Sequence, residues 1–217
     1  MSMGSERRVD VRDCHHAIID VRHCHQRYNC CMGRWEPDGR SRLEQAAMAL
    51  YIDRGYEETT VAQIAERAGL TERTFFRHFG DKREVLFSGA AALEVLLVTA
   101  VTDAPASATP LEAVAIALEA VGPMFEERRE FAPKRQAIIL SSVELREREL
   151  IKLASLSVAL ADALRSRGVP DPAAGLTGEV AIAVFKVAFE RWVEEDNQLD
   201  FSQMVHETLD QLKRVTI

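Results

Sequence analysis

Cysteine and histidine side chains are concentrated at the start of the chain. The first 31 residues hold all the cysteines and most of the histidines, namely Cys14, Cys24, Cys30, Cys31, His15, His16, His23 and His25. Thiolates and neutral imidazoles are the usual zinc ligands, so a metal site or a thiol sensor is one interpretation. However, the cysteines form no C-x2-C or C-x4-C pair. We therefore predict no metal site and no cofactor.

The alternative is that residues 1–31 are a non-native or disordered extension and that Met32 is the biological start. The segment has no apolar periodicity and five arginines, whereas the residues after Met32 run directly into a helical pattern. Both interpretations remain open.

A second group of chemically capable residues lies between Thr71 and Phe79. At about 100° per residue, Phe75 and Phe79 define the buried side of a helix, and Arg73 and Arg77 point nearly opposite. An arginine can donate two hydrogen bonds to guanine O6 and N7. This face could read DNA bases, or it could simply be solvated.

The elements that would position this face form a helix-turn-helix. Apolar spacing predicts a helix over residues 40–54 that ends at Gly55. Thr60 and Gln63 have the spacing of a capping box that opens a second helix. Gly69 supplies the turn, and Thr71 caps the third helix.

The whole run from Thr59 to Lys82 resembles the signature of TetR-type transcriptional regulators. The resemblance implies an all-α homodimer that binds operator DNA, most commonly as a repressor, and is released by a small ligand. It assigns contacts with the DNA backbone to Thr60, Phe76, His78 and Lys82. It assigns base contacts to Thr71, Glu72, Arg73, Thr74 and Arg77. Phe76 departs from the usual tyrosine and has no hydroxyl to donate to a phosphate.

The remainder of the chain also reads as helical. We expect a helix from Asp81 to about Val101, a loop up to Pro110, and further helices over residues 111–128, 133–142, 144–167, 171–195 and 201–215. The predicted domains are residues 32–87 for DNA binding and residues 88–217 for effector binding and dimerisation. In the resembled family the last two helices form the dimer interface.

The effector pocket is predicted from flexible and aromatic side chains that such pockets use. The candidates are Met124, Phe125, Arg135, Phe185, Phe189 and Trp192. The segments after Pro133 and Val143 resemble mycofactocin-type regulators, some of which respond to acyl-CoA. That resemblance suggests a hydrophobic anion as the effector, with Arg135 at its head group.

Composition and motifs exclude other classes of protein. We expect a cytoplasmic protein, because the chain has neither an apolar run of membrane-spanning length nor a signal-peptide pattern. We expect no enzyme, because it has no phosphate loop, nucleophile elbow or HExxH motif. The net charge of −7 lies within residues 88–217, whereas residues 40–87 carry eight basic and eight acidic side chains and are neutral. A local basic face therefore remains possible.

Overall fold

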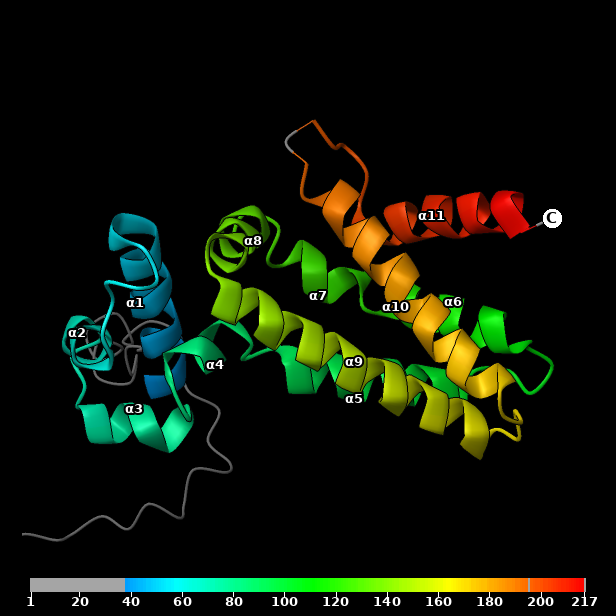
Figure 1. Ribbon diagram of the computed structural model, residues 1–217, viewed down its shortest axis with the longest axis horizontal. Coiled ribbons are helices and arrows are strands. Elements are labelled where there is room, and N and C mark those ends of the chain that lie inside the picture. The colour runs from blue at the N-terminus through cyan, green and yellow to red at the C-terminus, as the bar shows by residue number, and fades with distance from the viewer. Residues whose placement is uncertain (1–37, 195, 217) are drawn as a thin grey trace, which may run out of the picture. The chain divides into compact units, whose positions relative to one another are not determined.

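The computed structural model describes residues 38–194 and 196–216, and its regular structure in these ranges is entirely helical (Figure 1). The expectations for residues 1–31 and for the arm after Met32 lie outside the described residues. None of the described helices is both long and apolar enough to cross a membrane. The elements are α1 (Gly39–Arg54), α2 (Val61–Arg67), α3 (Glu72–His78), α4 (Lys82–Leu86), α5 (Ala90–Asp103), α6 (Pro110–Ala120), α7 (Gly122–Glu126), α8 (Ala132–Ser141), α9 (Val143–Ser166), α10 (Ala173–Trp192) and α11 (Phe201–Thr216).

The first three helices begin and end where local chemistry requires. The Thr60 hydroxyl accepts from the Gln63 amide, and the Gln63 side chain accepts from the Thr60 amide, which completes the expected capping box. Thr71 accepts from the Thr74 amide in the same way. Gly55 and Gly69 have φ of 85° and 65°, the left-handed region that glycine enters without a Cβ penalty.

The helix expected from Asp81 to Val101 is wrong as a single element, because it is divided into α4 and α5. The amide of Phe87 bonds the carbonyl of Glu84, and that of Ser88 bonds Val85, so the last turn tightens to i→i−3 bonds. Gly89 then opens α5 without a side-chain cap. The break gives α4 its own C-terminal carbonyl groups, which other helices contact.

Asp81 and Glu84 have the spacing of a capping box, but only half of it forms. Asp81 accepts from the Glu84 amide at 3.1 Å. The Glu84 carboxylate does not return to Asp81, because it pairs with Arg148 and Lys152 of α9.

The helix expected over residues 111–128 is likewise divided, into α6 and α7. Val121 caps both elements, and Pro123 occupies the first turn of α7. Proline lacks an amide hydrogen and cannot continue the hydrogen-bond ladder of the preceding helix.

Two hydrophobic clusters hold these helices. The first joins buried residues of α1 to α4 with Ile138 and Ile139 of α8 and Leu145 of α9. The second contains buried apolar side chains of α5, α6, α10 and α11, and of α9 from Leu156 onward. In the second, α9 and α10 lie over α5 and α6 (Figure 1), and α11 packs on α6, α7 and α10.

Candidate functional site

Two buried phenylalanines anchor α3 and fix which of its faces is exposed. Phe75 is fully buried and Phe79 nearly so, with their ring centroids 5.5 Å apart. Arg73 and Arg77, one turn apart on the other side, are exposed. The orientation expected from the sequence is therefore the one observed, and both guanidinium groups are accessible to a macromolecule.

Two of the three threonines of the candidate site, Thr60 and Thr71, are helix caps, and Thr74 lies in the first turn of α3. The hydroxyls of Thr60 and Thr71 accept from amides of their own helices, and the Thr71 and Thr74 hydroxyls lie 3.1 Å apart. Glu72 is exposed in the first turn of α3. The caps fix the start of α3, where amides without helical partners can face a phosphate.

Phe76 and His78 lie on the two shoulders of α3. Phe76 is 54% exposed and meets Phe75 edge-on at 5.5 Å, so the ring is supported on one side and open on the other. His78 is half-buried beside Phe79, and its Nε2 lies near the start of α1 at Gly39. An exposed aromatic ring without a hydroxyl offers a macromolecule apolar contact only.

Lys82 has local partners that the sequence did not predict. Its Nζ donates to the main-chain oxygens of Tyr56, Glu57 and Thr59 at 2.8, 3.2 and 2.9 Å. The same ammonium lies 4.3 Å from the centroid of the Tyr56 ring. An ammonium group has three hydrogens to donate. Lys82 therefore fixes the loop that precedes α2, and a phosphate would have to compete for it.

The tyrosine hydroxyl of Tyr51 reinforces this attachment by donating to the main-chain oxygen of Lys82 at 2.7 Å. Burial and the neighbouring Tyr56 raise the pKa of Tyr51 above its ordinary value. The hydroxyl therefore remains a neutral donor at physiological pH. Lys82 thus joins three elements, namely α1, the loop before α2 and the start of α4.

Charged side chains connect α4 to the helices that follow it. Glu84 accepts from Arg148 at 2.7 Å and from Lys152 at 3.2 Å, both on α9. Arg83 bridges Asp81 and Glu144. Burial opposes ionisation of Asp81, but the hydrogen bond from Arg83 outweighs it and the pKa of this carboxyl is lowered. These ion pairs connect α9 to the segment that follows α3.

Four of the six residues expected to form the ligand pocket meet in one aromatic cluster. Phe125 stacks on Phe201 with centroids 4.4 Å apart, and Trp192 packs edge-on against both rings. Phe185 and Phe189 complete the cluster. Phe201 belongs to it as well, and the sequence pattern gave no reason to separate it from the apolar row of α11.

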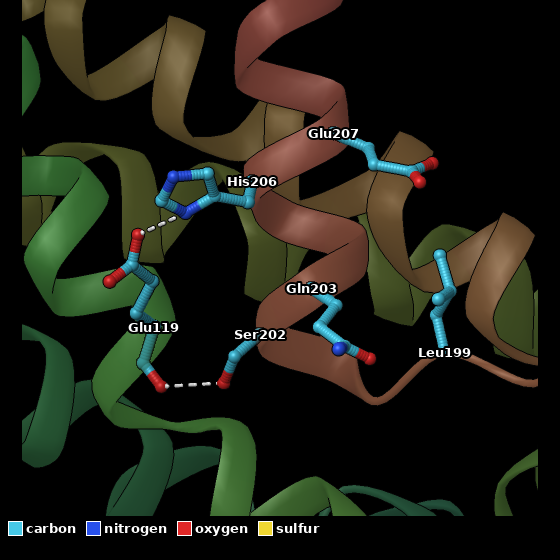
Figure 2. Close-up of a pocket in the computed structure, with 6 residues that line it drawn as sticks. All are labelled: Glu119, Leu199, Ser202, Gln203, His206 and Glu207. Atoms are coloured by element: carbon cyan, nitrogen blue, oxygen red, sulfur yellow. Dashed lines mark hydrogen bonds and ion pairs between the residues drawn. The ribbon is translucent and has the colours of Figure 1, made fainter.

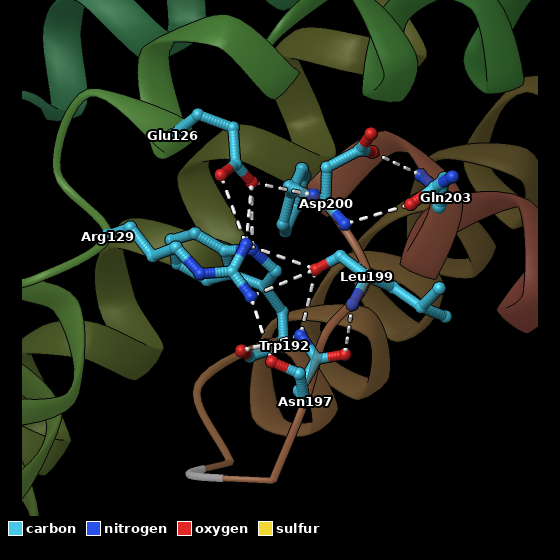
Figure 3. A network of polar contacts seen from close by, with 8 residues as sticks. Glu126, Arg129, Trp192, Asn197, Leu199, Asp200 and Gln203 are labelled. Atoms are coloured by element: carbon cyan, nitrogen blue, oxygen red, sulfur yellow. Dashed lines mark hydrogen bonds and ion pairs between the residues drawn. The ribbon is translucent and has the colours of Figure 1, made fainter.

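A half-buried carboxylate, that of Glu126, connects this cluster to the loop before α11 (Figure 3). Glu126 Oε1 accepts from the Trp192 indole nitrogen and from the Phe201 amide, both at 2.9 Å. Arg129 pairs with Glu126 and donates to the main-chain oxygens of Asn197 and Leu199. These contacts close the cluster on one side by fixing the loop.

The remaining two pocket candidates differ from each other in position. Met124 is half-buried next to Phe125 on α7. Arg135 lies on α8, where its Nε donates to the Leu86 carbonyl at 2.8 Å and its guanidinium lies over the Phe87 ring. Arg135 also pairs with Glu149 at 3.7 Å, and neither Leu86, Phe87 nor Glu149 is a member of the aromatic cluster. The structure thus does not show Arg135 beside the aromatic rings.

An open hollow of about 440 Å³ lies elsewhere, between α6 and the start of α11 (Figure 2). Glu119 and His206 face each other across it at 2.9 Å, and Ser202 donates to the Glu119 carbonyl. None of the pocket candidates lines it. Among the described residues, no group of three or more histidine, cysteine or acidic side chains is arranged to hold a metal ion.

Comparison with known proteins identifies both parts of the chain. Residues 44–88 match the model of bacterial regulatory proteins of the tetR family, and residues 108–216 match the MftR C-terminal domain. TcmR of Streptomyces glaucescens, an HTH-type transcriptional regulator, is 42% identical over 82 residues, which is 38% of this chain and 36% of TcmR. YvkB of Bacillus subtilis is 45% identical over 42 residues, 19% of this chain and 22% of that protein. The chain thus spans about a third or less of the length of these curated relatives.

Solved structures are similar in fold to about four fifths of this chain. FadR of Bacillus subtilis, in complex with stearoyl-CoA, covers 79% of this chain and 96% of its own, with a TM-score of 0.54 and 20% identity. FadR of Thermus thermophilus, in complex with lauroyl-CoA, covers 80% and 93%, with a TM-score of 0.52 and 22% identity. At this identity the likeness establishes the helical architecture alone. The match of the C-terminal half to the MftR domain confirms the mycofactocin-type resemblance, and the chain belongs to the TetR family of bacterial regulatory proteins.

Proposed function

We propose that this chain is a transcriptional regulator that binds operator DNA through α3 and is released from it by a small ligand, which makes it a repressor. The observation that carries the proposal is the exposed face of α3, where Arg73 and Arg77 project from a helix held by Phe75 and Phe79. Arginine at such a position can donate two hydrogen bonds to guanine in the major groove. The tetR-family match over residues 44–88 supports this role.

The proposed regulator acts as a homodimer. Two copies of α3 would enter successive major grooves about 34 Å apart, on an operator with approximate twofold symmetry. Dimerisation is expected of the family, and the HTH domain has only one reading helix per chain.

The proposed effector is a ligand with an apolar chain and an anionic head group, of which acyl-CoA is the leading example. The aromatic cluster around Phe125 supplies an apolar wall, and the FadR proteins that share this fold are described with acyl-CoA bound. The cluster is closely packed, so a ligand would have to separate the rings. The Nε of Arg135 is bonded to the Leu86 carbonyl, so its terminal guanidinium nitrogens would be the donors to a head group.

A release experiment tests the proposal. DNA fragments bound by the purified protein are selected from the source genome, and a fluorescent fragment is then titrated with stearoyl-CoA, with free coenzyme A as the control. A ligand that releases DNA must bind the DNA-free conformation more tightly, and a tenfold loss of DNA affinity corresponds to about 1.4 kcal/mol of preference. Failure to enrich any fragment would overturn the DNA-binding proposal, and release by coenzyme A alone would overturn the apolar-chain effector.

A further inference from the structure

One aromatic ring of the reading helix is exposed. Phe76 of α3 is 54% exposed, whereas Phe75 and Phe79 of the same helix are buried. Single exposed apolar residues are common on soluble proteins, so exposure by itself identifies no site. The position of Phe76 is what distinguishes it, because the exposed Arg73 lies one turn before it and the exposed Arg77 directly follows it. A ring between two side chains that can contact base edges is itself placed to contact DNA.

Packing holds the Phe76 ring in a defined position. Its centroid lies 5.5 Å from that of Phe75, with the two planes at 85°, which is the edge-to-face arrangement that aromatic pairs favour. Phe75 is fully buried and also contacts Phe79, so the support beneath Phe76 is part of the core. An aromatic side chain has only two torsions and loses little conformational entropy when it binds a partner. Phe76 therefore offers a rigid apolar surface.

Helix geometry places this ring on the flank of the first turn of α3. Glu72 and Arg73 precede Phe76 by four and three residues, the spacing at which side chains of one helix are neighbours. Side chains in a helix also lean toward its N-terminus. In helix-turn-helix proteins the N-terminal residues of the second helix contact base edges in the major groove. Phe76 thus borders the part of α3 that would enter the groove.

The chemistry of a phenyl ring limits what Phe76 can recognise there. The ring has no donor for a phosphate oxygen and neither donor nor acceptor for the polar atoms of the bases. The apolar group that base pairs present in the major groove is the 5-methyl of thymine. This methyl lies on the edge of the pyrimidine that is nearest its own sugar-phosphate backbone. It is therefore accessible to a side chain on the flank of a helix that lies in the groove.

We propose that Phe76 recognises a thymine of the operator through its 5-methyl group and so contributes base specificity. The inference rests on the proposed function, which places α3 in the major groove. Three residues of helix span about 4.5 Å, and the bases of one strand are spaced about 3.4 Å apart. The thymine is therefore expected next to the base that Arg73 contacts.

The test removes the methyl group from the DNA and the ring from the protein, separately and together. Selected operator fragments are synthesised with uracil in place of one thymine at a time, which deletes the methyl and keeps the hydrogen-bonding groups of the base. Fluorescence anisotropy measures the affinity of the unaltered protein, Phe76→Ala and Phe76→Tyr for each fragment. Ile52→Ala is the matched control, because Ile52 is a large apolar side chain on α1 that is 51% exposed. Circular dichroism measures the helix content of each variant.

A second control addresses Thr74, whose side-chain methyl could contact the same group of thymine. The Thr74 amide donates to the Thr71 hydroxyl, which fixes Thr74 in the first turn of α3. Thr74→Ser removes the side-chain methyl and keeps the hydroxyl. If Phe76 makes the contact, Thr74→Ser still distinguishes thymine from uracil.

We expect uracil at one position to weaken binding of the unaltered protein about fourfold, which corresponds to about 0.8 kcal/mol for one buried methyl group. This loss should disappear in Phe76→Ala and persist in Phe76→Tyr, Ile52→Ala and Thr74→Ser. Affinity that no uracil changes would overturn the inference, and this measurement needs no variant to fold. A loss that persists in folded Phe76→Ala, or that disappears in Thr74→Ser, would also overturn it, and each of these results leaves the proposed function in place. Failure to select any bound fragment would instead overturn the proposed function.

Discussion

The Nε of Arg135 donates to the main-chain oxygen of Leu86, the last residue of α4, at 2.8 Å. This bond satisfies a carbonyl that has no partner within its own helix, because α4 ends there. It also attaches the C-terminal end of α4 to α8. The start of α4 is held by Lys82, Tyr51 and Asp81, next to the reading helix, so α4 is fixed at both ends.

Replacing Arg135 should therefore weaken the fold and the coupling between effector and DNA. We expect Arg135→Ala to lower the free energy of unfolding by about 1–3 kcal/mol, because the Leu86 carbonyl and the Glu149 carboxylate each lose a partner. Urea denaturation measures this change. Lys134→Ala, an exposed neighbour on α8, is the control and should be nearly neutral. Equal stability of the two variants would show that the Arg135 contacts contribute nothing to folding.

Substitution of the α3 arginines should distinguish base-specific contacts from non-specific electrostatic attraction to DNA. Arg73→Ala and Arg77→Ala should each weaken binding to the selected operator by about 1–3 kcal/mol and relax the preference at one base position. Arg54→Ala removes an exposed arginine from the end of α1 and should change affinity less. Fluorescence anisotropy on operator and scrambled DNA gives both quantities. Unchanged operator affinity in both α3 variants would contradict the reading-helix assignment.

Lys82 offers a test between the role implied by family resemblance and the role seen in the fold. We expect Lys82→Met to lower the free energy of unfolding by about 1–3 kcal/mol, because three main-chain oxygens lose their donor. If its ammonium also contacts a phosphate, the slope of log affinity against log salt should fall by about one. If the slope is unchanged, the effect of Lys82 on DNA binding is wholly structural.

Local signals predicted the start of the site well, because caps and turns depend on residues close in sequence. The capping box of Thr60 and Gln63 and the glycine turn at Gly69 are of this kind. The break after Leu86 was missed since the apolar pattern continues through Phe87 into α5, and only Gly89 marks it. The break before α7 was missed as well, although Pro123 lies in the first turn of α7, where proline is common.

The sequence pattern could not predict contacts between segments that lie far apart in the chain. Nothing in the spacing around Lys82 or Arg135 indicates that each donates to main-chain oxygens of another segment. In the sequence, a lysine or arginine that binds a phosphate cannot be distinguished from one that donates to a main-chain oxygen. The boundary between the two domains, placed between residues 87 and 88, stays a prediction. Buried Ile138, Ile139 and Leu145, which follow that boundary in sequence, pack with helices α1 to α4, which precede it.

The carboxyl of Asp81 should make the stability of the fold depend on pH in the acid range. Its pKa is lowered in the folded state, chiefly by Arg83 acting against burial. A group with a lowered folded pKa contributes stability above its unfolded pKa, near 3.8, and this contribution is lost as pH falls through the folded value. Asp81→Asn keeps a good helix cap without the charge. Thermal unfolding from pH 6 to pH 3 should therefore show a smaller loss of stability in Asp81→Asn than in the unaltered protein, and identical pH profiles would contradict this role.

Substitutions in the aromatic cluster supply the sharpest test of the effector proposal, because its members differ in burial and in hydrogen bonding. Trp192 is 2% exposed and donates to Glu126, so Trp192→Ala should cost about 3–5 kcal/mol and leave the half-buried Glu126 carboxylate with one donor fewer. Phe189 is only partly buried and has no polar contact to lose. Phe189→Trp should therefore keep the fold, hold ligand-free operator affinity within about threefold, and alter the stearoyl-CoA concentration that releases DNA. Calorimetric unfolding and the release titration measure these effects, with Phe131→Trp, at an exposed position before α8, as the control. If Phe189→Trp leaves release unchanged, or if it unfolds the protein as Trp192→Ala does, then the aromatic cluster is core and the ligand binds elsewhere.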